Sequence, residues 1–136
     1  MAQLCQYKEE FSQLDTRLLI VSFATLPAVQ AWLKETCSTF EVLLDRERVV
    51  YKAYGLERSF WRSRNLKTIW KVVTHKLAGR PSYDSHGDDT TQLGGDFIID
   101  QDGILQLAYR SHDPTDRPTA QYLLTILRKL QVQGRF

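Results

Sequence analysis

The chain has 136 residues, of which 43% are hydrophobic and 25% charged, and its formal net charge is +2 at pH 7. This composition is typical of one folded domain, and so small a charge does not by itself indicate a nucleic acid partner. The two cysteines, Cys5 and Cys37, form neither a Cys-x-x-Cys pair nor a metal-ligand spacing, and no apolar run approaches the roughly 20 residues that span a bilayer. We therefore expect a single cytoplasmic domain over residues 1–136 with no membrane partner.

The first part of the chain alternates helical and strand patterns. Residues 2–14 carry apolar side chains at spacings of three and four, which is one face of a helix. The run LLIVSFA, residues 18–24, is apolar and β-branched, which is typical of a strand buried on both faces in a parallel sheet. Thr25 and Pro27 indicate the start of a helix that should end near Cys37.

The middle of the chain predicts a second strand and a strongly basic helix. FEVLL, residues 40–44, is the strand, after which Asp45 can cap a short helix that ends at Gly55. Residues 57–80 contain seven Lys or Arg and one Glu, and their apolar members fall on one helical stripe. Residues 81–95 are rich in turn formers and predict a loop.

The last part of the chain predicts a hairpin and a helix. In residues 96–110, DFIIDQDGILQLAYR, two apolar runs flank a turn in which Gly103 is free to take positive φ. A turn and cap at 113–118 lead into a helix over 118–131, which packs through its leucines. The alternating elements predict an α/β fold, and the closing hairpin and helix are typical of a thioredoxin-like sheet.

Four segments together resemble a known family. They are GGDFIIDQDGILQLAYRS at 94–111, LLDRERVVYKAYGL at 43–56, LKTIWKVVTHKL at 66–77 and HGDDTTQLGG at 86–95. The first resembles the hairpin of the peroxiredoxin family, of the alkyl hydroperoxide reductase and thiol-specific antioxidant (AhpC/TSA) type. The last two are similar to the peroxiredoxin-like 2 subgroup. The resemblance implies a thioredoxin-like sheet flanked by helices, no cofactor, and a thiol-dependent redox or antioxidant role.

The resemblance also implies that part of the family fold is missing here. In the family, a buried strand and a Cys-containing turn, often Cys-x-x-Cys, precede the first helix, and the thiol at the helix start is the redox centre. Gln3-Leu4 and Glu10-Phe11 match the register of that helix, so the family's redox cysteines would fall before Met1. We therefore expect this chain to lack the first central strand and the peroxidatic cysteine, which leaves open whether it is an enzyme.

Three outcomes are open for a sheet without its central strand. Residues 18–24 could pair directly with residues 96–100, a second chain could fill the gap, or the chain could be a fragment of a longer protein. We expect that this chain is a fragment of a longer gene product and that the isolated chain forms a dimer. If the chain is active, the resemblance implies peroxide and a thioredoxin-type reductant as partners.

Cys5 is the candidate catalytic residue, since it is the thiol nearest the family's redox centre. It lies about one turn into its helix, where the helix dipole has begun to fade, which favours a structural thiol. Cys37 lies at a helix end that disfavours a thiolate. A disulfide between the two would need Cα atoms within about 7 Å, and their helices are expected to flank a strand, so we predict that they do not pair.

A loop before the hairpin is the second candidate site region. In thioredoxin-like folds this loop borders the redox turn, which implies such a place for Thr91, Gln92, Gly94 and Gly95. Peroxiredoxins often place an arginine in this loop to support peroxide reduction. The matching position here is Gly94, a departure that weakens a peroxidase assignment.

Two other patterns suggest different chemistry. His86, Asp88 and Asp89 could be drawn as a metal site, but residues of these types on a glycine-containing loop more often form a turn, so we expect no metal. The basic segment 57–80 could dock nucleic acid or a membrane surface, although a helix with solvated Lys and Arg is favoured. The alternative function is therefore a non-catalytic interaction module that binds its partner through residues 57–80.

Overall fold

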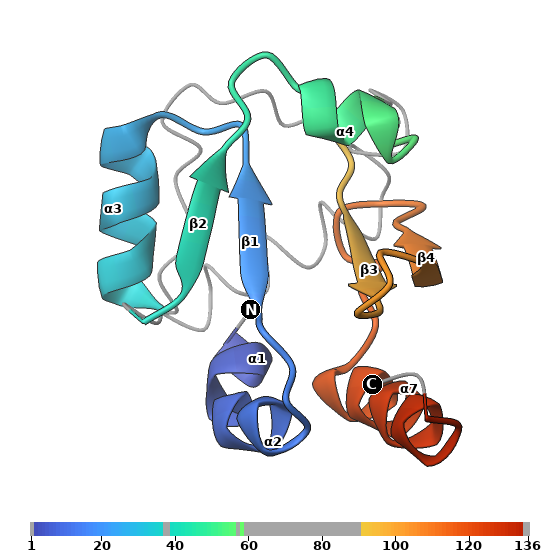
Figure 1. Ribbon diagram of the computed structural model, residues 1–136. Coiled ribbons are helices and arrows are strands. Elements are labelled where there is room, and N and C mark those ends of the chain that lie inside the picture. Colours follow the sequence, from blue (N-terminus) through green and yellow to red (C-terminus); the bar gives the residue numbers. More distant parts are fainter. Residues whose placement is uncertain (1, 37–38, 57, 59–90, 135–136) are drawn as a thin grey trace.

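The computed structural model describes residues 2–36, 39–56, 58 and 91–134, with side chains from Leu4 onward. In chain order the elements are α1 (Ala2–Gln6), α2 (Lys8–Gln13), β1 (Leu19–Ser22), α3 (Leu26–Glu35), β2 (Glu41–Leu44), α4 (Val49–Ala53), β3 (Gly95–Ile99), β4 (Leu105–Arg110) and α7 (Ala120–Val132). Figure 1 shows α3 beside β2 and β1, the β3–β4 hairpin on the other side of β1, and α1, α2 and α7 gathered at one end. The described part of the chain is a mixed α/β fold.

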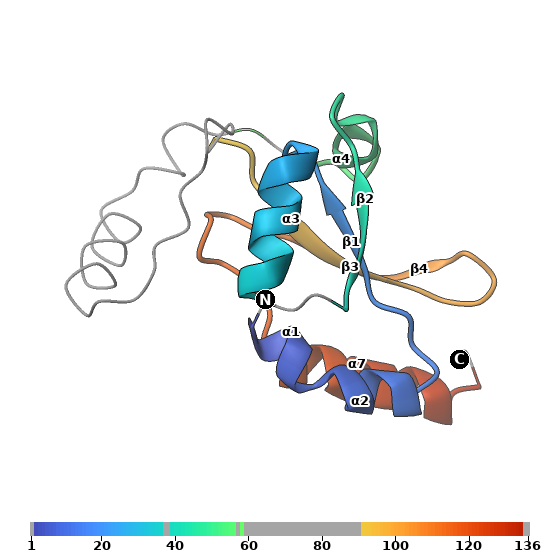
Figure 2. The same cartoon turned by 90° about the vertical axis from the view of Figure 1, so that its left-hand side faces the viewer.

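The predicted N-terminal helix is present as two short helices. The break falls at Tyr7, and the N–H of Leu14 at the end of α2 bonds back to the carbonyls of Glu10 and Phe11. The predicted apolar face is confirmed, because Phe11 is buried and Leu4 packs against the same cluster. This face holds α1 and α2 against α7, as Figure 2 also shows.

Strands β1 and β2 pair in parallel, as the sequence predicts. Leu19 lies opposite Glu41 and Ser22 opposite Leu44. The expectation that this apolar strand is buried on both faces is wrong, because no residue of β1 is buried and Leu19 is 47% exposed. The physical reason is that, within the described residues, β1 pairs along one edge only.

The helix that follows β1 begins as predicted, whereas α4 begins at Val49 with Arg48 at its N-cap, later than the predicted cap at Asp45. Thr25 occupies the N-cap of α3, and α3 ends at Glu35, close to the predicted end. Asp45 supports α4, since its carboxylate accepts hydrogen bonds from the N–H groups of Val49 and Tyr51 at 2.8 and 3.0 Å. Gly55 follows α4 with a φ of 68°, which glycine adopts without steric cost.

The predicted β-hairpin is confirmed by antiparallel pairing of β3 with β4. Gly95 lies opposite Arg110, and the turn contains Gly103 at a φ of 80°. Asp100 organises this turn, because its Oδ1 accepts from the N–H groups of Asp102 and Ile104 at 3.0 and 2.8 Å. Two-residue periodicity and turn chemistry were therefore sufficient to locate the hairpin.

The described hydrophobic core is divided into two clusters. The larger one buries Phe11 and Ile98 against four leucines of α7, Leu123, Leu124, Leu127 and Leu130. The smaller one lies between α3 and the β1–β2 pair and buries Ala24, Ala28 and Val29. The two clusters correspond to the two separate pairs of strands that the described residues form.

The outcome in which residues 18–24 pair with 96–100 is therefore wrong for the described residues, because β1 pairs with β2 and β3 pairs with β4. Residues 57 and 59–90 lie outside the described residues, and with them all of the predicted basic helix except Arg58, most of the predicted loop, and the histidine and aspartates of the metal alternative.

Candidate functional site

Cys5 lies on α1, and its side chain is partly buried. The prediction of a free thiol is wrong, because Cys5 is disulfide-bonded. The described residues contain no free cysteine. The sequence has one other cysteine, Cys37, which lies outside the described residues. The sequence argument placed the helix of Cys5 across a strand from the helix that follows β1, whereas Figure 2 shows α1 just below one end of α3.

The predicted loop forms the entry into strand β3. Gln92 forms an isolated antiparallel bridge with Arg58, and Leu93 is among the most deeply buried side chains, at 2% exposure. Gly95 begins β3, where an added Cβ would lie 2.7 Å from the carbonyl oxygen of Tyr109 and 2.8 Å from Leu56 Cδ2. A glycine is required at this position because neighbouring backbone and side-chain atoms occupy the space of any larger residue.

Arg117 lies over this loop and was missed by sequence reasoning. Its Nη1 donates to the carbonyl of Gly95 at 3.0 Å and to Asp96 Oδ2 at 2.8 Å. A Cβ on Gly94 would collide with the same guanidinium. An arginine thus lies beside the position where peroxiredoxins often place one, but it comes from the segment between β4 and α7. No local pattern in the sequence could have indicated this contact.

Tyr51 on α4 lies at the neighbouring strand end. Its hydroxyl donates to the carbonyl of Val21 in β1 at 3.1 Å, and its ring packs edge-on against Phe23. Burial raises the pKa of Tyr51 above its usual value, and the charge of Arg117 opposes this effect. Tyr51 is therefore a protonated hydrogen-bond donor at neutral pH.

The structure does not bring the two predicted parts of the site together. Figure 1 places α1, which carries Cys5, at one end of the fold and the start of β3, at Gly95, at the other end beside α4. Figure 2 shows the same separation along the vertical axis. The predicted loop of Thr91, Gln92, Gly94 and Gly95 therefore contacts Arg117, through Gly94 and Gly95, at the end of the fold away from Cys5.

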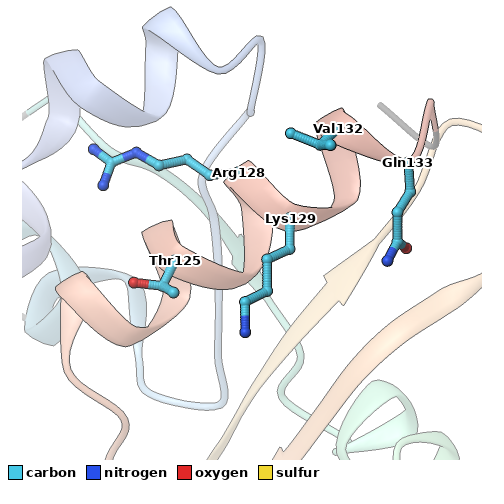
Figure 3. A pocket seen from close by; sticks show the side chains of 5 residues that line it. All are labelled: Thr125, Arg128, Lys129, Val132 and Gln133. Carbon is cyan, nitrogen blue, oxygen red and sulfur yellow. The ribbon is translucent and has the colours of Figure 1, made fainter.

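Figure 3 shows a shallow pocket lined by five side chains of the α7 region: Thr125, Arg128, Lys129, Val132 and Gln133. All come from one helix and its C-cap, and Val132 is 88% exposed, so this is a hollow on an open helix face. Among the described residues, no cluster of three or more His, Cys, Asp or Glu side chains is placed to hold a metal. No described helix is long and apolar enough to cross a membrane.

Comparisons with known proteins agree with the resemblance in the sequence. A family model described as AhpC/TSA antioxidant enzyme matches residues 3–115. The chain is 22% identical to Peroxiredoxin-like 2C of Mus musculus over 134 residues, which cover 88% of this chain and 57% of the mouse protein. The chain thus spans little more than half the length of this relative. The family implies a thioredoxin-like fold, with which the mixed α/β arrangement agrees. The chain belongs to the AhpC/TSA antioxidant family.

Proposed function

We propose that this chain has a thiol-dependent redox role, carried out by thiol–disulfide exchange at Cys5, and that it lacks peroxidase activity. The observation that carries this proposal is the disulfide at Cys5 in a member of a thiol-dependent family. The side chain of Cys5 is partly exposed, so the thiolate of another protein has access to the disulfide.

The proposed chemistry transfers two electrons from an external dithiol to the disulfide. A thiolate of the reductant attacks one sulfur, and the second sulfur leaves as a thiolate, which forms a mixed disulfide. The other thiolate of the reductant then attacks this mixed disulfide. The products are a disulfide on the reductant and two thiols on this chain. A thioredoxin-type dithiol is the reductant class that the family suggests.

The position of Cys5 supports the absence of peroxidase activity. A peroxidatic thiol needs its thiolate stabilised, and a helix N-terminus provides that through free N–H groups and the helix dipole. Cys5 is the fourth residue of α1. Arg117, which lies beside Gly94, is bonded to Asp96 and lies at the end of the fold away from α1. Arg117 is therefore not placed to support peroxide reduction at Cys5.

A coupled assay tests the proposal. The chain is mixed with thioredoxin, its reductase and NADPH, and NADPH loss is followed with and without hydrogen peroxide or an organic hydroperoxide. We expect one stoichiometric burst of NADPH loss as the disulfide is reduced, which Cys5→Ser and Cys37→Ser both abolish, and no sustained turnover on peroxide. Sustained turnover that Cys5→Ser abolishes would contradict the absence of peroxidase activity. A missing burst would contradict exchange at Cys5.

The predictions of cytoplasmic location and of a dimer remain predictions. The dimer follows from the interrupted sheet, and sedimentation velocity at several concentrations tests it.

A further inference from the structure

The β3–β4 hairpin has one face toward α7 and one face away from it. Ile98 is buried in the larger hydrophobic cluster, among the leucines of α7. Side chains alternate between the two faces of a strand, so Phe97 and Ile99 lie on the face away from this cluster. Ala108 lies opposite Phe97 and Leu105 lies opposite Ile99, and residues directly opposite each other share a face. The face away from α7 therefore carries a stripe of apolar side chains.

Most of this stripe is exposed. Tyr54, at the end of α4, packs edge-on against Phe97 with the ring centroids 4.7 Å apart, which covers the stripe near the start of β3. Beyond Phe97, Ile99 and Leu105 are each 44% exposed, and Ile104 in the adjoining turn is 57% exposed. Figure 2 shows the reason, since the hairpin tip projects away from the helices and from the β1–β2 pair. Large apolar side chains gathered on an open surface are typical of an interaction site. We call Phe97, Ile99, Ile104, Leu105 and Ala108 the hairpin stripe.

A buried carboxylate holds the hairpin tip in shape. Asp100 is 9% exposed, and its Oδ1 accepts from the N–H groups of Asp102 and Ile104 at 3.0 and 2.8 Å. Its Oδ2 accepts from Gln106 Nε2 at 2.6 Å. A segment that is already ordered loses little conformational freedom when it binds, which favours association. The hairpin tip therefore presents its exposed apolar side chains in a fixed arrangement.

Opposite charges lie at the two ends of the hairpin stripe. Arg110, at the end of β4, is exposed and lies opposite Gly95, on the face of the stripe. Its Nε donates to the carbonyl of Tyr54 at 2.7 Å, and its guanidinium lies 5.8 Å from the centroid of the Phe97 ring. At the other end, the turn carries the exposed carboxylate of Asp102. The stripe thus has a positive end and a negative end.

We propose that the hairpin stripe is the contact surface between two copies of this chain, which stack their stripes face to face in opposite directions. A two-fold axis across the stripes makes one surface complementary to itself, so each copy supplies the same patch. In this arrangement Arg110 of each copy meets Asp102 of the other, and the exposed apolar side chains are buried between them. Stacked in the same direction, like charges would meet at both ends. A second copy therefore carries the charge pattern that the stripe requires.

This contact surface differs from the two other surfaces at which the chain is expected to act. A dimer that closes the interrupted sheet would use backbone groups at strand edges, whereas the hairpin stripe uses apolar side chains and charges on a strand face. The two kinds of dimer therefore respond differently to side-chain substitutions at the hairpin tip. The stripe does not include Cys5, so the contact surface and the proposed thiol exchange can be tested separately.

Sedimentation velocity over a range of concentrations tests the proposal. We expect a concentration-dependent dimer, which Ile104→Ser weakens at least about tenfold because it removes the most exposed large side chain of the stripe. Val132→Ser is the matched control, since Val132 is 88% exposed on α7, and it should leave the dimer unchanged. A chain that stays monomeric up to about 0.5 mM would overturn the proposal and would leave the stripe to a different partner. A dimer that Ile104→Ser leaves intact would also overturn it, because the contact would lie elsewhere, such as at the interrupted sheet.

A pair of charge reversals tests the antiparallel direction. Arg110→Glu and Asp102→Lys each bring like charges together at both ends, so each variant alone should dimerise at least about tenfold more weakly. Mixed together, the two variants should form a heterodimer, since each reversed charge then faces the reversed charge of the other copy. Two folded variants that form no heterodimer would overturn the proposal.

Urea unfolding checks that both charge variants fold, because Arg110→Glu also removes the hydrogen bond to the Tyr54 carbonyl. Asp102→Lys changes only an exposed side chain of the turn, so it decides the role of charge if Arg110→Glu does not fold. A dimer of unchanged strength in Asp102→Lys would then contradict the proposal.

Discussion

Arg117 supports the start of strand β3 by donating from Nη1 to the carbonyl oxygen of Gly95 at 3.0 Å. The same atom is 2.8 Å from Asp96 Oδ2, and the guanidinium lies directly over Gly94. A side chain from the segment before α7 therefore satisfies a backbone acceptor at the start of β3. Gly94 leaves room for the Arg117 guanidinium, whereas Gly95, the first residue of β3, leaves room for Tyr109 and Leu56.

The two glycines should differ in how much they tolerate alanine. In Gly95→Ala the new Cβ meets the backbone carbonyl of Tyr109 and the ring of Phe97, so we expect a loss of about 1–3 kcal/mol in the free energy of unfolding. In Gly94→Ala the collision is with the flexible end of Arg117, which can move, so the loss should be clearly smaller. Urea unfolding of both variants checks this. Equal losses would contradict the geometry.

Asp45 should be important for stability through α4. It is 8% exposed, and its carboxylate accepts from two backbone N–H groups, those of Val49 and Tyr51. Asp45→Ala leaves both donors without this acceptor, and we expect a loss of about 1–2 kcal/mol. Glu47→Ala is the matched control, since Glu47 is an exposed carboxylate two residues away, and it should change stability by less than about 0.5 kcal/mol. A larger effect at Glu47 than at Asp45 would contradict this assignment.

The hydrogen bond between Tyr109 and Asp116 should make the free energy of unfolding depend on pH in both the acid and the alkaline range. The N–H of His112 and the hydroxyl of Tyr109 both donate to Asp116 and lower its pKa, whereas the bond to Asp116 raises the pKa of Tyr109. Asp116 therefore stabilises the folded state at pH values above the usual carboxyl pKa, near 4, and this stabilisation is lost as the pH falls below that value. Tyr109 stabilises the folded state at pH values below about 10, and this stabilisation is lost as the pH rises above that value.

Unfolding of Tyr109→Phe measured across pH checks the Tyr109–Asp116 bond. The variant should lose the part of the alkaline dependence that Tyr109 contributes, and only part of the acid dependence, because His112 still donates to Asp116. Asp116→Asn should lose the acid dependence. Unchanged pH profiles in both variants would show that this hydrogen bond does not form in solution.

Local patterns in the sequence predicted most of the described elements. Apolar periodicity located the helix face at Phe11 and the leucines of α7, and turn chemistry located the hairpin at Gly103. The exposure of β1 could not be predicted, because an apolar run does not reveal how many neighbouring strands will cover it. A pattern of period two fixes a strand but not its partners.

The candidate site was harder to predict than the fold. Its contacts join residues far apart in the chain, such as Tyr51 with Val21 and Arg117 with Gly95, and no spacing rule connects them. The disulfide at Cys5 was missed for a related reason. The prediction used the expected order of layers, whereas the distance between two cysteines depends on how the ends of their helices are placed.

Thiol trapping tests the central claim, exchange at Cys5, most directly. The chain, purified without reductant, is alkylated before and after reaction with reduced thioredoxin, and the mass of the intact protein is measured. We predict no alkylated sulfur before the reaction and two after it, one for each cysteine of the chain. Cys5→Ser should show one alkylated sulfur in both samples. Two free thiols in the untreated chain, or a disulfide that thioredoxin leaves intact, would contradict the account.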